Sequence, residues 1–129
     1  MKPKTIISWV LRLAGAIILL QTLFFKFTAA PESVELFSQL GAEPVGRIGV
    51  GIAELITSIL LLVPKTVWLG ALGGIGLMLG AIGSHVFVLG IEVGGDGGLL
   101  FILAVIVLLA STIILFLHKD EIKNPLAAV

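Results

Sequence analysis

The fold is decided by the stretch VGRIGVGIAELITSILLLV, residues 45–63, an apolar run that holds two charged side chains, Arg47 and Glu54. At a rise of about 1.5 Å per residue, this run is long enough to cross the hydrocarbon core of a bilayer as a helix, with Glu54 near the midplane. An ionised carboxylate is costly in hydrocarbon, so an ionisable residue at this depth is a candidate functional residue. We therefore expect Glu54 to face the interior of a helix bundle.

The rest of the chain is similarly apolar. Of its 129 residues, 58% are hydrophobic and 12% are charged, whereas soluble domains carry roughly 25% charged residues. The mean hydropathy is +1.21. Three further apolar runs, at residues 6–27, 66–89 and 99–117, have about the length of a membrane-spanning helix. The sequence therefore predicts an all-α membrane four-helix bundle in which residues 1–129 form a single transmembrane domain.

A short helix is expected between the first and second spans, at residues 31–40 (PESVELFSQL). Pro31 suits the first helical position, and Gly41 directly follows the end of the pattern. The segment has one apolar face but is too short to cross a bilayer. We expect it to lie along the membrane interface or over the mouth of the bundle.

The third span is rich in small residues. Gly70 with Gly74, and Gly76 with Gly80 and Ser84, repeat the small-xxx-small spacing that lets helices approach closely in lipid. This spacing predicts that residues 66–89 form a central helix of the bundle, with both sets of small residues at helix contacts.

Several classes of function are disfavoured. The formal net charge is zero and no basic run occurs, so a nucleic-acid partner is not expected. The absence of cysteine excludes disulfides and thiol redox chemistry by this chain itself. The two histidines, His85 and His118, are far apart and lack a helical His/Glu pair, which speaks against a metal site. No Ser/His/Asp constellation suggests itself, so the catalytic residues and the question of catalysis stay open.

The polar residues at membrane depth define the candidate site: Arg12, Lys26, Arg47, Glu54 and His85. The first two share a face of the first span, and Arg47 and Glu54 share a face of the second. We expect an outward-opening cavity lined by Lys26, Arg47, Glu54 and His85 and floored by Arg12. We also expect Arg12 or Arg47 to contact Glu54. The alternatives are that Lys26 and Arg12 reach lipid headgroups and that Glu54 is a purely structural partner of an arginine.

Three segments resemble the DoxX family: VLRLAGAIILLQTLFFKF (10–27), PESVELFSQLGAEPVGRIGVGIAELITSILLLVPKTVWLGAL (31–72) and MLGAIGSHVF (78–87). The resemblance covers about residues 7–117 and implies a four-helix membrane bundle. The positions that match the family pattern are Arg12, Lys26, Glu54 and His85. The chain departs from the pattern at residues 22–25, where Thr-Leu-Phe-Phe replaces a small-Gly step, and in having no cysteine.

The resemblance implies several roles, because members of the family look like subunits of quinone-linked sulfur oxidoreductases, parts of membrane redox-stress complexes, or assembly factors for receptors. The first hypothesis is a membrane subunit of a redox-linked complex that binds a small amphipathic or quinone-like ligand; quinone is the one cofactor considered. The alternatives are a non-enzymatic accessory or assembly protein and a small proton-coupled transporter. The expected partners are the lipid bilayer and a membrane-protein partner or a second copy of the chain.

The orientation is predicted from the charges of the loops and tails. Lysines collect on one side (Lys2, Lys4, Lys65, Lys119 and Lys123), and acidic residues collect on the other (Glu32, Glu35, Glu43, Glu92 and Asp96). The positive-inside rule then places both termini in the cytoplasm of what we expect to be a bacterial cell, with the protein in its plasma (inner) membrane.

We predict that cysteines introduced at Glu35 and Asp96 react with a membrane-impermeant maleimide on intact cells, whereas a cysteine at Lys65 does not. Labelling of the first two positions only after permeabilisation would reverse the orientation.

Overall fold

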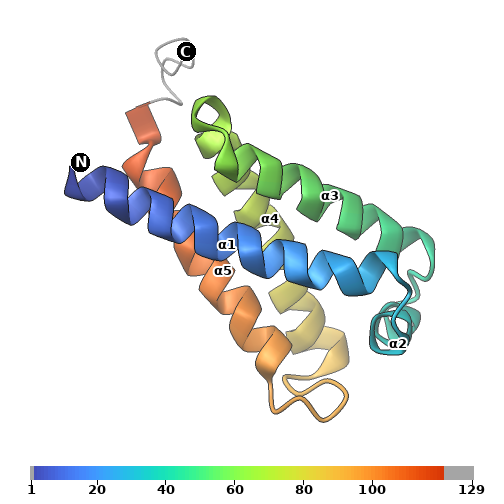
Figure 1. Ribbon diagram of the computed structural model, residues 1–129. Coiled ribbons are helices and arrows are strands. Elements are labelled where there is room, and N and C mark those ends of the chain that lie inside the picture. Colours follow the sequence, from blue (N-terminus) through green and yellow to red (C-terminus); the bar gives the residue numbers. More distant parts are fainter. Residues whose placement is uncertain (1, 121–129) are drawn as a thin grey trace.

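The computed structural model describes residues 2–120, so Lys123 lies outside the described residues. The helices follow in the order α1 (Pro3–Phe27), α2 (Pro31–Gln39), α3 (Val45–Leu62), η1 (Pro64–Thr66), α4 (Val67–Ser84), η2 (His85–Leu89) and α5 (Leu99–Leu117) (Figure 1). No strand occurs within residues 2–120. The predicted all-α fold, with a short helix between the first and second long ones, is confirmed.

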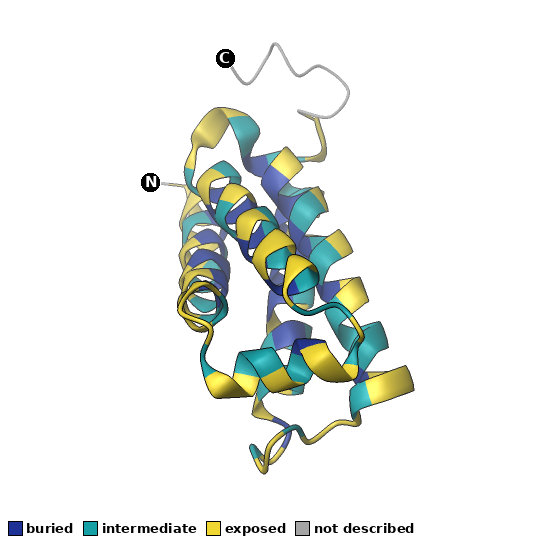
Figure 2. Cartoon of the chain, turned by 90° about the vertical axis from the view of Figure 1, so that its right-hand side faces the viewer, coloured by how far each residue is buried: buried dark blue, intermediate teal, exposed yellow. Residues whose placement is uncertain are grey.

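Four helical stretches are long and apolar enough to cross a membrane: Pro3–Phe27, Val45–Leu62, Pro64–Leu89 and Leu99–Leu117. Their outward surfaces are exposed and apolar, as expected for helices that face lipid (Figure 2). Helix α2 lies crosswise at one end of the bundle, together with the loop of residues 90–98 (Figures 1 and 2). The N-terminus and η1 lie at the opposite end (Figure 1). The protein is therefore a membrane-embedded four-helix bundle.

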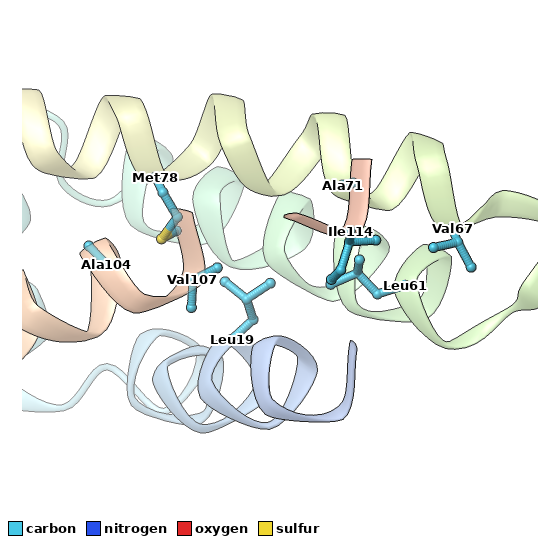
Figure 3. Close-up of a cluster of buried hydrophobic side chains, with 8 residues drawn as sticks. All are labelled: Leu19, Leu61, Val67, Ala71, Met78, Ala104, Val107 and Ile114. Atoms are coloured by element: carbon cyan, nitrogen blue, oxygen red, sulfur yellow. The ribbon is translucent and has the colours of Figure 1, made fainter. Parts of the chain in front are cut away.

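The buried apolar core is built from four helices (Figure 3). Its members are Leu19 from α1, Leu61 from α3, Val67, Ala71 and Met78 from α4, and Ala104, Val107 and Ile114 from α5. Lipid tails are as apolar as these side chains, so close packing rather than exclusion of water must hold the helices together. The small residues of α4 make that packing possible.

Two glycines of α4 allow close helix contacts. A Cβ atom at Gly70 would lie 2.7 Å from the backbone nitrogen of Leu61, and one at Gly74 would collide with the hydroxyl of Ser111. By contrast, a Cβ at Gly76 or Gly80 would meet no atom within 4 Å. The expectation of close packing is therefore right for Gly70 and Gly74 and wrong for Gly76 and Gly80, which face open space instead of a neighbouring helix.

We predict that Gly70→Ala destabilises the protein, by about 1–3 kcal/mol if the helices shift to relieve the clash. Gly83→Ala is the matched control, since a Cβ at Gly83 meets nothing within 4 Å. It should leave stability unchanged or raise it slightly through helix propensity. Unfolding of both variants in mild detergent is the measurement, and equal midpoints would show that the α3–α4 contact does not depend on Gly70.

Candidate functional site

A cavity of about 910 Å³ lies at the α2 end of the bundle. Its polar lining residues are Thr22, Lys26, Glu32, Ser33, Glu35, Gln39, Glu54, Ser84, His85 and Asp96, and the remaining lining residues are mostly apolar. Leu19, Met78 and Ala104 of the core also line it. Gly76 and Gly80 form part of the wall, which explains why they contact no other helix. The volume lies within the range of small-molecule sites in proteins, about 300–1,000 Å³.

Glu54 projects from α3 into the wall of this cavity and is 3% exposed. Lys26 Nζ lies 2.9 Å from its Oε1 atom, and the hydroxyl of Thr22 donates a hydrogen bond of 2.9 Å to its Oε2 atom. Each carboxylate oxygen of Glu54 therefore has a polar partner from α1, the ammonium of Lys26 for Oε1 and the hydroxyl of Thr22 for Oε2.

The expected contact between Glu54 and an arginine is wrong for Arg47. The Arg47 Nε atom lies 2.9 Å from Oε1 of Glu43, four residues earlier, and its Nη1 atom donates to the backbone carbonyl of Lys26. Glu43 lies in the turn directly before α3 and so beside Arg47, whereas Glu54 lies seven residues, or about two turns, further along the helix. Arg47 is buried but does not line the cavity.

Arg12 lies toward the other end of the bundle, so it does not form the floor of the large cavity. Its Nε atom donates a hydrogen bond of 2.6 Å to the carbonyl of Leu61, and its guanidinium lies 3.6 Å from the centre of the Trp9 ring. It lines a separate cavity of about 280 Å³ with Lys2, Lys4, Thr5, Ser8 and His118. Arg12 sits too far toward the N-terminus of α1 to reach Glu54, which pairs with the other end of that helix.

The two arginines act in the same way on opposite helices. Arg12 of α1 donates to Leu61 near the C-terminus of α3, and Arg47 of α3 donates to Lys26 near the C-terminus of α1. The last carbonyls of a helix have no intrahelical partner and carry the negative end of its dipole. Each arginine thus neutralises the end of the neighbouring antiparallel helix.

His85 is placed at the cavity by a local change in the helix. It begins the π-helical turn η2, in which the Gly90 N–H donates to the carbonyl of His85 over 2.7 Å. Its Nδ1 atom lies 3.0 Å from the carbonyl oxygen of Gly90, which can only accept, so Nδ1 carries the proton. Phe101 packs edge-on against the imidazole.

Asp96 orders the loop beside the cavity, a role not predicted from the sequence. Its carboxylate accepts hydrogen bonds from the backbone N–H groups of Val93, Gly98 and Leu100, at 3.0, 2.8 and 3.2 Å. Burial raises the pKa of Asp96, but these hydrogen bonds and the charge of His85 outweigh it and hold the pKa below its ordinary value. The carboxylate thus stays charged at neutral pH.

The structure therefore brings together three of the five predicted site residues at the cavity, Lys26, Glu54 and His85. Arg47 contacts the backbone of Lys26 but does not line the cavity, and Arg12 lies toward the other end of the bundle. The structure also adds Thr22. The sequence could have indicated Thr22 as a site residue, because it lies four residues before Lys26 and so shares its helix face.

We predict that Lys26→Met destabilises the protein by about 3–5 kcal/mol, because it leaves a buried carboxylate without its cation. Adding Glu54→Gln should recover part of the loss, so the double variant should be more stable than the sum of the single effects. Lys65→Met, in an exposed turn, is the control and should change stability little. Strictly additive effects in a double-mutant cycle would show that the pair does not contribute.

The DoxX family model matches residues 7–90, well over half of the chain. The matched range holds all five predicted site residues and ends at Gly90, before the loop that Asp96 orders. Comparisons with curated proteins and with solved structures gave no match. The chain belongs to the DoxX family of membrane proteins.

Proposed function

We propose that this DoxX-family protein is a membrane subunit that binds a small amphipathic molecule in the 910 Å³ cavity. The observation that carries the proposal is the pairing of a large, mostly apolar cavity with a buried ion pair, Lys26–Glu54, on its wall. The cavity opens to the surface, and open, mostly apolar hollows of this size with a few polar groups are typical of small-molecule sites. Space beside buried charge suits a ligand with one polar and one apolar end.

The two ends of the cavity ligand would meet different surroundings. Its polar end would lie near Lys26, Glu54 and His85, which supply an ammonium, a carboxylate and an imidazole. Its apolar end would lie against α4 and α5, where Leu77, Met78 and Leu103 line the cavity. A few placed polar groups on an apolar surface are the usual composition of a small-molecule site.

We propose a redox-linked membrane complex as the setting, following the family resemblance, with a quinone-like compound among the candidate ligands. A quinone carbonyl accepts hydrogen bonds, and the ammonium of Lys26 is the donor best placed to supply one. Because the chain has no cysteine, any thiol redox chemistry would belong to a partner subunit. An accessory or assembly protein that binds a membrane partner remains the alternative role.

We further propose that the whole chain forms one transmembrane domain in the plasma membrane of a bacterial cell, with the cavity on the outer side. The support is the distribution of charge, since Lys2, Lys4 and Lys65 lie at the end away from the cavity. The end that carries α2 holds Glu32, Glu35 and Asp96 instead.

We predict that Gly80→Leu abolishes ligand binding without unfolding the protein. A Cβ at Gly80 meets no atom within 4 Å, and the added side chain would occupy the cavity. Gly49→Leu is the matched control, because Gly49 has the same open surroundings but does not line the cavity. Native mass spectrometry from mild detergent should detect a co-purifying small molecule in the wild type and in Gly49→Leu only.

Added decylubiquinone tests the quinone-like class in the same experiment. Its binding by the wild type and loss in Gly80→Leu would support that class. If no co-purified or added amphipath is retained more strongly by the wild type than by Gly80→Leu, the cavity is not a ligand site and the proposal is wrong.

A further inference from the structure

The charges around the cavity are strongly unequal. Four carboxylates line it, those of Glu32, Glu35, Glu54 and Asp96, against the one ammonium of Lys26. His85 is the remaining titratable group of the lining. Low-dielectric walls focus the field of such a cluster into the cleft, so a cation is attracted into it and an anion is repelled.

We propose that the ligand carries a positive charge at its polar end, as an amine or quaternary ammonium on an apolar body. This inference rests on the proposed function, since it names the charge class of the ligand in the same cavity. It separates the cavity ligand from anionic amphipaths, such as fatty acids and lipid phosphates, and from neutral ones, such as quinones.

Lys26 already shows how an ammonium fits this site. Its Nζ atom lies 2.9 Å from Glu54 Oε1 and so occupies the position that the ammonium of a ligand would take. Oε1 is buried and is held by the ammonium of Lys26, so a ligand ammonium would take this position by displacing Lys26. Lys26 is the last residue but one of α1, and its long side chain can turn toward the headgroups when a ligand cation replaces it.

The surroundings of the pair also favour a cation. Phe25 and Phe37 line the cavity, and aromatic faces attract ammonium groups. The carboxylate of Asp96 already accepts hydrogen bonds from three backbone N–H groups, so it would attract a ligand cation through its charge and not through a direct contact. Glu32 and Glu35 are exposed, and their attraction is therefore modest and screened by salt.

Three probes with the same dodecyl chain test the proposal: dodecyltrimethylammonium, dodecanol and dodecyl phosphate. Each would be titrated into the full-length protein in phosphatidylcholine nanodiscs, with empty nanodiscs to subtract partitioning and Gly80→Leu to identify binding in the cavity. We expect the ammonium to bind about tenfold or more tightly than the phosphate, with the alcohol between them, and its affinity to fall with rising salt.

Substitutions at the cavity then distinguish a cationic ligand from other ligands, because they change the affinity in opposite directions. Lys26→Met removes the competing ammonium, so it should raise the affinity for the cationic probe, whereas a ligand that accepts from Lys26 would bind more weakly. The double substitution Glu32→Gln/Glu35→Gln, at two exposed positions, should lower the affinity for the cationic probe about three- to tenfold. It replaces Lys26→Met as the test if that variant does not fold. Asp120→Asn, which lies outside the cavity lining, is the charge control and should have no effect.

The outcomes distinguish the two proposals. Cavity binding of the alcohol or the phosphate at least as tight as that of the ammonium, or no response of the ammonium probe to Glu32→Gln/Glu35→Gln, overturns the cationic class and leaves an amphipath site in place. Failure of all three probes to show binding that Gly80→Leu removes overturns both the cationic class and the proposed function.

Discussion

The reciprocal contacts of Arg12 and Arg47 join α1 to α3, and the pairing of Glu54 at the cavity depends on them. The last carbonyls of a helix lack intrahelical donors and carry the negative end of its dipole, so a nearby cation stabilises them. Each arginine supplies a charged donor to the end of the opposite helix, at Leu61 and at Lys26. Hydrogen bonds to charged groups contribute about 1.5–3 kcal/mol each, more than neutral ones. The two contacts lie at opposite ends of the α1–α3 interface and join each helix to the other.

One consequence concerns Glu54. Because both arginines bind backbone carbonyls at the two ends of the α1–α3 contact, the buried carboxylate of Glu54 contacts Lys26 and Thr22 instead. A lysine is a flexible point charge with three rotatable donors, whereas an arginine would have held the carboxylate in a rigid fork. The buried carboxylate is thus paired with a point charge at the wall of the cavity.

The cavity depends equally on how α4 uses its glycines. Gly70 and Gly74 bring α4 against α3 and α5 and produce the solid core of Figure 3. Gly76 and Gly80 have no such neighbours and leave space in front of the helix. The helix then changes to a π-turn at His85, and such turns are frequent at functional sites. The glycines of α4 thus serve two purposes, since Gly70 and Gly74 allow close helix packing and Gly76 and Gly80 leave the space of the cavity.

The sequence alone determined the all-α class, the four long apolar helices, the short helix before Gly41 and the inward direction of Glu54, since these follow from hydropathy and from the helical period of each segment. It also indicated Lys26 and His85 as site residues. Only the tertiary structure decided that Glu54 pairs with Lys26, that Asp96 orders the loop, and which glycines contact a helix. These features depend on the rotation and offset between helices, which the pattern within one helix does not contain.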